Sequence, residues 1–349
     1  MKVEEKTLLI RADSGLNVGI GHLMRCLALA QAWQASGGKA VFATTENSRA
    51  GDILRSKGME FFDVAAVSGS SEDAALTAEM AGCFGVNWIV IDGYRFDTDY
   101  QRRVKKAGRR LFCLDDYGQA EHYYADLILN QNLQAHDSLY VNREPDTGLL
   151  LGPRYVLLRE EFLEWSGRER EIKDAARRVL ITLGGSDPNN VTRRVVQGLQ
   201  RVEIEGLEGV VVVGPSNPFG VELEASLLGS GRSVRLERDV ANMPELMTWA
   251  DVAVSGAGST CWELAFMGTP FITIILAENQ EPIAESLSKT GGAVSAGWYH
   301  ELTPETLAEQ LVELIGDRRL RVNLSRRGRE IVDGRGAARV SRFLEVALS

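Results

Sequence analysis

The chain has 349 residues, of which 44% are hydrophobic and 25% charged, and 39 Lys and Arg against 48 Asp and Glu give a formal net charge of −9. This composition is typical of a globular protein and excludes disordered and fibrous classes. At ~100–200 residues per domain, the length predicts two domains. The acidic balance argues against nucleic acid as the main partner, although helix N-termini can still bind a local anion.

The sequence gives no sign of export, membrane insertion or a metal centre. Its first residues hold two glutamates and a short apolar run, unlike a secretory signal, and its longest apolar runs fall well short of the ~20 residues that span a bilayer. Four cysteines and four histidines are too scattered for a zinc cluster. We therefore predict a cytoplasmic protein with no metal site and no membrane insertion.

The first half of the chain alternates short apolar runs with helical patterns. Apolar strands that alternate with helices are typical of a parallel sheet covered on both faces. A helix is predicted from His22 to the Gly37-Gly38 stop and another at 98–106, and strands are predicted at 7–11, 40–44, 87–92, 110–115 and 127–129.

The second half repeats the same alternation. We predict strands at 178–183, 209–213, 251–255 and 271–276, and helices at 189–199, 260–267, 304–315 and 320–331. The fold class is therefore α/β, with two Rossmann-like domains whose parallel sheets face a central cleft. Ligands of such sheets bind at the carboxyl ends of the strands. The predicted boundaries are 1–160 for the first domain, 161–177 for a charged linker, 178–333 for the second domain, and 334–349 for a C-terminal helix that packs back on the first domain.

Three glycine-rich turns each join a predicted strand to a predicted helix. Glycine lets a ligand approach the backbone, and free N–H groups at a helix N-terminus favour phosphate. Tight turns need glycine in any case, but two such turns in the second domain favour a phosphate site there. A Walker lysine and a complete GxGxxG are both missing, which argues against ATP hydrolysis and dinucleotide redox chemistry. The turns are Gly19-Ile20-Gly21, Gly184-Gly185-Ser186 and Gly256-Ala257-Gly258-Ser259-Thr260.

His22 is the most informative single residue, because it follows Gly21 at a predicted helix N-terminus. The helix dipole there favours a neutral imidazole, which can take a proton from water or a hydroxyl. The alternative is a histidine that merely caps its helix. Asp13, just past the first strand, is a candidate to orient His22 or to bind a sugar hydroxyl, or is a plain turn residue. Tyr94 follows the third strand, as a substrate contact or as a surface tyrosine.

Other charged residues have less distinctive positions. Asp115 and Asp116 resemble a metal-binding carboxylate pair, but we favour an N-cap residue with a solvated neighbour. By position alone, Arg25 is expected on a solvated helix face. In the second domain, Glu263 lies one turn into a predicted helix, where a carboxylate can accept both hydroxyls of a ribose or can simply complement the dipole. Asn279-Gln280 follows the last strand, where amides could bind sugar or phosphate oxygens.

Taken in order along the chain, these motifs resemble the UDP-sugar hydrolases of the pseudaminic acid pathway (PseG). The resemblance spans most of the sequence. That family is similar to the MurG type of GT-B glycosyltransferase, in which the C-terminal Rossmann-like domain holds most of the nucleotide. The matching residues are Arg11-Ala-Asp13-Ser14, Gly19-x-Gly21-His22-x-x-Arg25, Ile91-Asp92-x-Tyr94, Leu114-Asp115-Asp116, Leu129-Asn130-x-Asn132, Leu158-Arg159-Glu160-Glu161-Phe162, Gly184-Gly185-Ser186-Asp187, Glu263 and Asn279-Gln280-Glu281.

The resemblance implies an activity and a set of site residues. Family members hydrolyse UDP-2,4-diacetamido-2,4,6-trideoxy-β-L-altropyranose at the anomeric carbon, with water as acceptor and without a metal or other cofactor. It implies that His22 activates water and that Tyr94 and Asn279 hold the sugar or the water. The implied UDP-sugar contacts are Glu263 at the ribose, Met243 near the uracil, Gly258, Ser259 and Thr260 at the diphosphate, and also Gly21, Arg25, Arg159, Gly185, Ser186 and Gln280.

Two alternatives stay open. One is a GT-B glycosyltransferase that passes a sugar from UDP to a surface-polysaccharide or lipid acceptor. Such enzymes often carry an apolar membrane-facing patch on the first domain, whereas the first helix here is predicted to be amphipathic, with Gln31, Gln34 and Ser36 on its exposed face. The other is a non-catalytic nucleotide-sugar binder, which would not need a base. The stretch 134–151 is an addition to the compact members of the family, and we expect it to reshape the sugar pocket.

Overall fold

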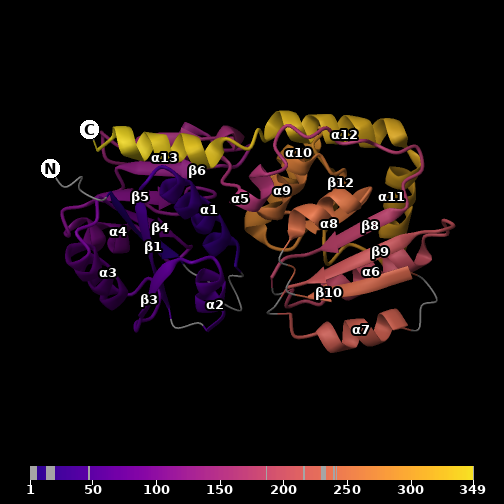
Figure 1. Ribbon diagram of the computed structural model, residues 1–349, viewed down its shortest axis with the longest axis horizontal. Coiled ribbons are helices and arrows are strands. Elements are labelled where there is room, and N and C mark those ends of the chain that lie inside the picture. The colour runs from indigo at the N-terminus through magenta and orange to yellow at the C-terminus, as the bar shows by residue number, and fades with distance from the viewer. Residues whose placement is uncertain are drawn as a thin grey trace. The chain divides into compact units, whose positions relative to one another are not determined.

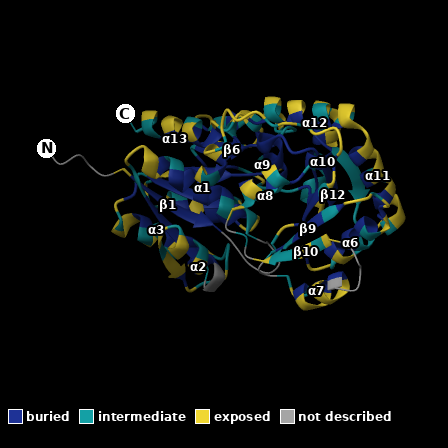
Figure 2. Cartoon of the chain, turned by 45° about the vertical axis from the view of Figure 1, so that its right-hand side comes forward, coloured by how far each residue is buried: buried dark blue, intermediate teal, exposed yellow. Residues whose placement is uncertain are grey.

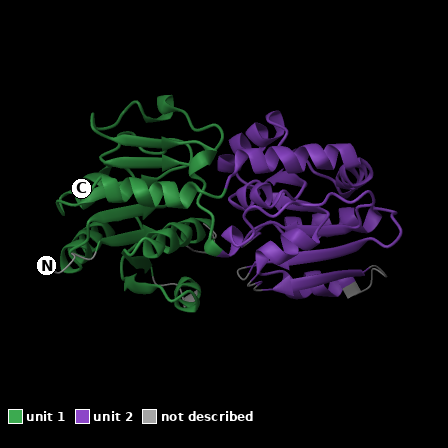
Figure 3. Cartoon of the chain, turned by 45° about the horizontal axis from the view of Figure 1, so that its top comes forward, with its two compact units in different colours: residues 1–160, 334–349 green, residues 161–333 purple. Residues whose placement is uncertain are grey.

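The computed structural model describes residues 6–12, 20–45, 48–185, 187–214, 217–228, 233–238, 240 and 242–348. The chain divides into two compact units, Met1–Glu160 with Gly334–Ser349, and Glu161–Asp333 (Figure 3). Each unit contains its own parallel sheet.

The first unit is a seven-stranded parallel sheet with the order β3-β2-β1-β4-β5-β6-β7. Buried apolar residues fill its central strands (Figure 2). Side chains of Ser70 and Asp97 accept backbone N–H bonds at the starts of α3 and α4, as N-caps do. The elements, most of which are labelled in Figure 1, are β1 (Thr7–Ala12), α1 (Gly21–Ala35), β2 (Lys39–Thr45), α2 (Ser48–Ser56), β3 (Glu60–Val64), α3 (Ser71–Cys83), β4 (Trp88–Asp92), α4 (Thr98–Lys105), β5 (Arg110–Leu114), β6 (Leu127–Asn130), the 3₁₀ turn η1 (Asp137–Tyr140), β7 (Gly148–Leu151), the 3₁₀ turn η2 (Pro153–Tyr155), the start of α5 (Glu160–Leu163), and α13 (Gly336–Val346).

The strand order places β1 beside β4. From β1 the chain continues to β2 and β3 on one side of the sheet, and from β4 it continues to β5, β6 and β7 on the other side. Ala12 at the end of β1 is in register with Asp92 at the end of β4. Ligands of open parallel sheets bind at this reversal point, outside the carboxyl ends of the strands. Residues that follow β1, β4, β5 and β6 therefore share one edge of the first sheet.

The C-terminal helix α13 packs on α1 within the first unit. Trp88 Nε1 donates to the carbonyl of Leu344 at 3.3 Å, and Gly336 lies so close to the backbone that a Cβ there would be 2.1 Å from the carbonyl oxygen of Val156. Because α13 covers its outer side, α1 is buried on most of its surface, and the prediction of an amphipathic first helix is wrong. Gln31, expected to be exposed, is buried and accepts the backbone N–H of Glu160, whereas Gln34 and Ser36 are exposed as predicted.

The second unit is a six-stranded parallel sheet with the order β10-β9-β8-β11-β12-β13, and its reversal point lies between β8 and β11. Its elements are the rest of α5, β8 (Arg178–Thr182), α6 (Val191–Arg201), β9 (Glu208–Val213), α7 (Gly220–Leu228), β10 (Ser233–Arg238), α8 (Met243–Trp249), β11 (Val252–Gly256), α9 (Thr260–Met267), β12 (Phe271–Ile275), the 3₁₀ turn η3 (Glu278–Gln280), α10 (Glu281–Lys289), β13 (Val294–Trp298), α11 (Pro304–Gly316) and α12 (Arg318–Ile331).

The segment expected to be a linker, 161–177, belongs to this second unit. Hydrogen bonds from arginine side chains hold this segment in the second unit. Arg321 Nη2 donates to the carbonyls of Lys173 and Asp174, both at 2.9 Å, and Arg170 donates to the carbonyls of Met247 and Ala250. The segment is therefore an ordered part of the second unit.

The predicted strands and helices all occur, and their ends agree with the structure to within two residues. The sequence analysis did not predict four strands, β3, β7, β10 and β13, and these are the outer strands of the two sheets. The stretch 134–151 supplies η1 and β7, so it extends the first sheet.

A buried ion pair links β1 to α3. Arg11 Nε and Nη2 donate to the two carboxylate oxygens of Asp73 at 2.9 and 2.8 Å, and both side chains are fully buried. Thr77 and Tyr100 donate further hydrogen bonds to Asp73, and Phe96 lies under the guanidinium. Because both charges are shielded from water, the charged form of each side chain depends on the other side chain for its stabilisation.

We expect Arg11→Met to lower the free energy of unfolding by ~3–5 kcal/mol, because it leaves a buried carboxylate without its cation. Arg102→Met is the matched control, since its pair with Asp99 is exposed and should change stability by less than ~1 kcal/mol. Urea unfolding of both variants measures the difference. Equal losses of unfolding free energy in the two variants would show that the buried ion pair contributes no more to stability than the exposed one.

Candidate functional site

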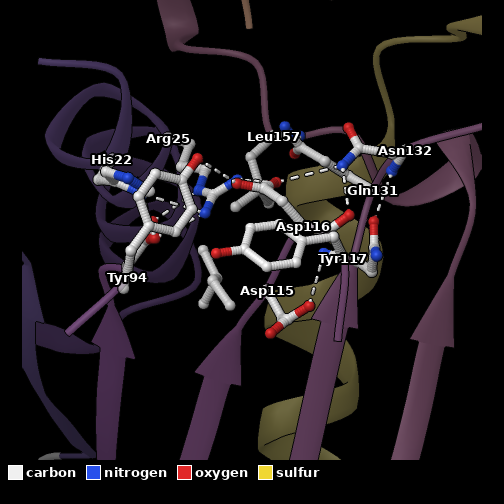
Figure 4. Close-up of polar contacts among 12 residues, drawn as sticks. His22, Arg25, Tyr94, Asp115, Asp116, Tyr117, Gln131, Asn132 and Leu157 are labelled. Atoms are coloured by element: carbon white, nitrogen blue, oxygen red, sulfur yellow. Dashed lines mark hydrogen bonds and ion pairs between the residues drawn. The ribbon is translucent and has the colours of Figure 1, made fainter. Parts of the chain in front are cut away.

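His22 is the second residue of α1 and lies at the reversal point of the first sheet (Figure 4). Its side chain is 6% exposed, and its Nδ1 lies 2.6 Å from Oδ1 of Asp92, the last residue of β4. Asp92 is fully buried. The two strands that end side by side thus bring together an imidazole and a carboxylate from distant parts of the sequence.

The charge of Asp92 determines which nitrogen of His22 carries hydrogen. Burial alone would raise the pKa of Asp92, but Arg25 and His22 lower it below the usual range, so the group is an ionised acceptor. Nδ1 must then carry the hydrogen that Asp92 accepts. Nε2 forms no hydrogen bond with any residue that the structure describes, and in the uncharged form of the ring the lone pair lies on this nitrogen. Such a nitrogen can act as a general base.

Arg25, one turn further along α1, holds two carboxylates at once. Its Nε and Nη2 donate to the two oxygens of Asp92, both at 2.6 Å, and its Nη1 donates to Oδ1 of Asp116 at 2.6 Å. Burial would lower the pKa of Arg25, but Asp116 and Asp92 raise it well above its ordinary value. The expectation of a solvated Arg25 is wrong, because this side chain is buried and shared between two carboxylates.

Asp116 and Tyr94 complete a closed ring of contacts. The Tyr94 hydroxyl donates to Oδ2 of Asp116 at 3.0 Å, and the Tyr94 ring meets the His22 ring edge-on, with centroids 4.6 Å apart at 81°. Burial and the neighbouring Asp116 raise the pKa of Tyr94 above its ordinary value, so the hydroxyl stays protonated. The ring runs His22, Asp92, Arg25, Asp116, Tyr94 and back to His22.

Asp115 does not cap a helix, and Asp116 is not solvated, contrary to the sequence prediction for this pair. Asp115 accepts the backbone N–H groups of residues 117, 118 and 119, together with the hydroxyls of Tyr123 and Tyr140 at 2.6 and 2.9 Å. It anchors the loop after β5. Asn132 Nδ2 donates to the backbone carbonyl of Asp116 and to its Oδ1. In the part of the chain that the structure describes, no three His, Cys, Asp or Glu gather as metal ligands.

Two aromatic side chains are exposed at this ring of contacts: Tyr94, which belongs to it, and Tyr117, which lies beside Tyr94. Tyr94 is 38% exposed and Tyr117 is 44% exposed, and their ring centroids are 5.8 Å apart. Aromatic faces left open next to a base suit contact with the apolar side of a bound molecule. The sequence analysis did not single out Tyr117.

The second unit has its own polar edge, at the carboxyl ends of β11 and β12. Gly258, Ser259 and Thr260 are half-buried where α9 begins, and Glu263 is half-buried in the first turn of that helix. Gln280 accepts the backbone N–H of Leu276 at 3.1 Å, and a Cβ on Gly258 would lie 3.8 Å from its Nε2. Asn279 lies half-buried in η3 beside it.

The turn after β8 differs from the turn after β11. Asp187 is in the left-handed region, with φ of 44°, and its buried carboxylate accepts the N–H groups of Val191 and Thr192, both at 2.8 Å. An internal carboxylate thus occupies the first amides of α6, where phosphate was expected. Gly185 is packed against the end of β9, since a Cβ on Gly214 would lie 2.4 Å from its Cα.

The remaining predicted residues are distributed over both units. Met243 is the half-buried first residue of α8, which packs against α9. Gly21 is the first residue of α1, and Arg159 is buried in the first unit. Asp13 and Ser186 lie outside the described residues.

Asp92 is not among the partners predicted for His22, and Asp13, one candidate to orient His22, lies outside the described residues. The strand order of a Rossmann-like sheet is a signal for this partner. After β3 the chain returns to the middle of the sheet, so β4 lies beside β1 and the end of β4 is next to the end of β1. The structure also places no helix long and apolar enough to cross a membrane among the described residues.

The two α/β units and their structural neighbours define a GT-B fold. The crystal structure of Acinetobacter baumannii MurG superposes with a TM-score of 0.66 at 14% identity, over 98% of this chain and 99% of that one. Residues 179–327 match the glycosyltransferase family 28 C-terminal domain.

Three sequence relatives are more specific. The chain is 26% identical to the UDP-2,4-diacetamido-2,4,6-trideoxy-β-L-altropyranose hydrolase of Campylobacter jejuni, over 81% of this chain and 97% of the hydrolase. It is 23% identical to the spore coat polysaccharide biosynthesis protein SpsG of Bacillus subtilis, over 96% and 97%. It is 24% identical over 80% of its length to an uncharacterized protein of Methanocaldococcus jannaschii, MJ1062, and spans 59% of that protein.

The Asp116–Arg25 contact predicts an acid-dependent loss of stability. Burial would raise the pKa of Asp116, but Arg25 lowers it, so its contribution is present above the ordinary carboxyl pKa of ~3.9 and is lost as pH falls through the lower folded value. Asp116→Asn should cost ~1.5–3 kcal/mol at pH 7, the scale of a hydrogen bond to a charged group.

Urea unfolding between pH 7 and pH 3 measures the difference in the free energy of unfolding between wild type and Asp116→Asn, and this difference should become smaller below about pH 4. Asp52→Asn is the control, because the exposed Asp52–Arg55 pair should contribute less than ~1 kcal/mol. A gap between wild type and Asp116→Asn that stays constant with pH would contradict the ionised pair.

Proposed function

We propose that the protein hydrolyses a UDP-linked 2,4-diacetamido-2,4,6-trideoxy sugar, the β-L-altropyranose, to release UDP and the free sugar for pseudaminic acid biosynthesis. The observation that carries the proposal is the buried His22–Asp92 pair, which leaves Nε2 of His22 as a base. The name of the Campylobacter jejuni relative supports the substrate. The family 28 match supports a nucleotide-sugar enzyme, with the nucleotide in the second unit.

In the proposed reaction, Nε2 of His22 takes a proton from water as the water oxygen bonds to the anomeric carbon. The bond from that carbon to the diphosphate oxygen breaks, and UDP leaves with the electron pair. Asp92 holds the imidazole in one tautomer and stabilises the imidazolium that forms. The N–H groups at the start of α9 would stabilise the charge that develops on UDP, with no metal required.

The proposal gives the other site residues separate roles. Tyr94 donates its hydroxyl hydrogen to Asp116, and in this proposal its oxygen accepts a hydrogen bond from the sugar. Asn279 would hold the sugar or the water, Glu263 the ribose hydroxyls and Met243 the uracil. Arg25 positions Asp92 and so acts through His22, because its N–H groups are bonded to carboxylates of the protein itself.

A second candidate is glycosyl transfer, which the match to a glycosyltransferase C-terminal domain and the likeness to SpsG favour. The same base would then deprotonate an acceptor hydroxyl in place of water. The two reactions differ in one requirement, because a transferase needs an acceptor before UDP is released at a useful rate.

The decisive experiment measures UDP release from UDP-2,4-diacetamido-2,4,6-trideoxy-β-L-altropyranose without any acceptor and with EDTA present. Wild type should release UDP, and His22→Ala should lower turnover at least ~100-fold while UDP affinity stays within a few-fold, because a general base contributes on that scale. His122→Ala is the control, since His122 is a surface histidine bonded to Glu144.

Each outcome has one meaning. UDP binding without release by the wild type would favour the transferase. An equal loss of turnover and UDP affinity in His22→Ala would remove His22 as the base. Release that EDTA abolishes would contradict the metal-independent reaction.

Glu263→Ala should weaken UDP binding by roughly tenfold, the effect of losing charge-assisted hydrogen bonds to the ribose. Glu305→Ala is matched to it, because Glu305 lies in the first turn of α11 and shares the favourable dipole position. Calorimetric titration with UDP measures both. The same UDP affinity in the two variants would exclude the ribose contact.

A further inference from the structure

The second unit contains a groove of about 590 Å³ that plays no part in the proposed reaction. It lies along α12 and is lined on one side by Arg170 and Ile172 of the segment that precedes β8. Its charged lining consists of Arg170, Arg318, Arg326, Arg329 and Glu330, so four positive charges against one negative leave a formal charge of +3. In a chain whose net charge is −9, this is a marked local excess of cations.

The sequence of α12 concentrates these cations. Arg318–Ile331 holds six arginines and one glutamate. Glu330 is already engaged, because Arg326 and Arg327 reach its two carboxylate oxygens at 3.2 and 2.7 Å. Arg318 pairs with Asp174 at 2.8 Å. The carboxylates near the groove are thus shared among more arginines than they can neutralise.

Arg170 and Arg329 have carbonyl partners instead of carboxylates. Arg170 donates to the carbonyls of Met247 and Ala250, and Arg329 Nη2 donates to the carbonyl of Arg168 at 2.8 Å. Neither guanidinium forms an ion pair with any residue that the structure describes. Nε of Arg170 is buried and has no hydrogen-bond partner among the same residues. Burial lowers the pKa of Arg170 to about 10, which still leaves it charged at neutral pH.

The groove is also lined by apolar and polar groups. Val322 and Ser325 of α12 line it beside Ile172. Underneath, α12 packs directly on α9: a Cβ on Gly328 would lie 3.0 Å from the Cα of Ala265, and one on Gly268 would lie 2.8 Å from Cδ of Arg329. The stem of Arg329 therefore lies against the backbone of Gly268.

We propose that this groove binds a small, multiply charged phosphate-type anion. Its volume lies in the range of small-molecule sites. A planar guanidinium group can form bidentate hydrogen bonds with two phosphate oxygens. Charge-assisted hydrogen bonds of this kind are about twice as strong as hydrogen bonds between neutral groups. A bound anion would balance part of the excess positive charge of the arginines that line the groove.

The place of the groove links it to the candidate nucleotide edge. Arg170 donates to carbonyls at the C-terminal end of α8, and Arg329 crosses Gly268 at the C-terminal end of α9. Those are the two helices whose N-termini carry Met243 and Thr260. The anion site would thus occupy the opposite end of both helices, and it does not depend on the proposed reaction.

The probe is inorganic pyrophosphate, titrated calorimetrically into the full chain at low salt, with and without saturating UDP. We expect pyrophosphate to bind in both conditions. Arg326→Glu should weaken its affinity at least ~10-fold, because the substitution removes a cation from the groove and adds an anion. Arg319→Glu is the matched control, since it makes the same charge change on an exposed face of α12 outside the lining and should alter the affinity less than ~3-fold.

Three results would overturn the proposal: no binding of pyrophosphate, loss of binding when UDP is present, or equal weakening in Arg319→Glu and Arg326→Glu. Loss of binding in the presence of UDP would mean that pyrophosphate binds at the nucleotide edge. Equal weakening in the two variants would mean that pyrophosphate responds only to the overall positive charge of α12. Arg329→Ala adds an independent arm. Should this variant fail to fold because Arg329 packs over Gly268, the exposed Arg326 still decides the matter, since its substitution leaves the packing with α9 intact.

Discussion

The first unit depends on one buried guanidinium. Arg25 touches both carboxylate oxygens of Asp92 and one of Asp116, and so makes it possible to bury two acidic side chains within a few ångströms of each other. Without a cation, two carboxylates in a dry environment would repel each other and take up protons. With it, both stay ionised, and Asp92 can hold His22 in one tautomer. The availability of a free imidazole nitrogen therefore follows from the position of an arginine that need not touch the substrate.

That position is a consequence of strand order. Because β4 lies against β1, the residue that ends β4 meets the helix that follows β1, and His22 and Arg25 lie on one face of α1, three residues apart. The loop after β5, anchored by Asp115, brings in Asp116, and Asn132 after β6 steadies it. Four strand ends thus contribute to one cluster. Fixed contacts of this kind position a base before any substrate arrives, which is the condition under which electrostatic preorganisation is effective.

The sequence specifies the interior of each sheet better than its edges. Central strands such as β1, β4, β8 and β11 are buried on both faces, so they read as continuous apolar runs, whereas β3 and β10 are largely exposed and carry mixed residues. The same difference applies to the site. His22 was predictable from its local context, a glycine before a helix. The strand order indicates that Asp92 lies near His22, but local sequence does not show whether Asp92 and Asp116 are solvated or paired, because their pairing with Arg25 is set by contacts 67 and 91 residues apart. Gln31 failed for a related reason: the helix that covers it, α13, comes from the far end of the chain.

The two helix N-termini of the second sheet show how one kind of motif can serve two purposes. Both α6 and α9 follow a glycine-rich turn at the reversal point, and by sequence each is equally suited to phosphate. In α6 the first amides bond to the chain's own Asp187, whose strained left-handed backbone is held in place by those bonds. In α9 the residue before the helix makes no such side-chain bond within the described chain, and the amide of Gln280 lies over the turn. A phosphate at α6 would have to displace a buried carboxylate from these amides, so Asp187 and the first turn have a structural role. At α9 the N–H groups of Cys261 and Trp262 instead donate to the carbonyls of Gly258 and Ser259 at 3.0 and 3.1 Å, and the side chain of Ser259 does not cap the helix.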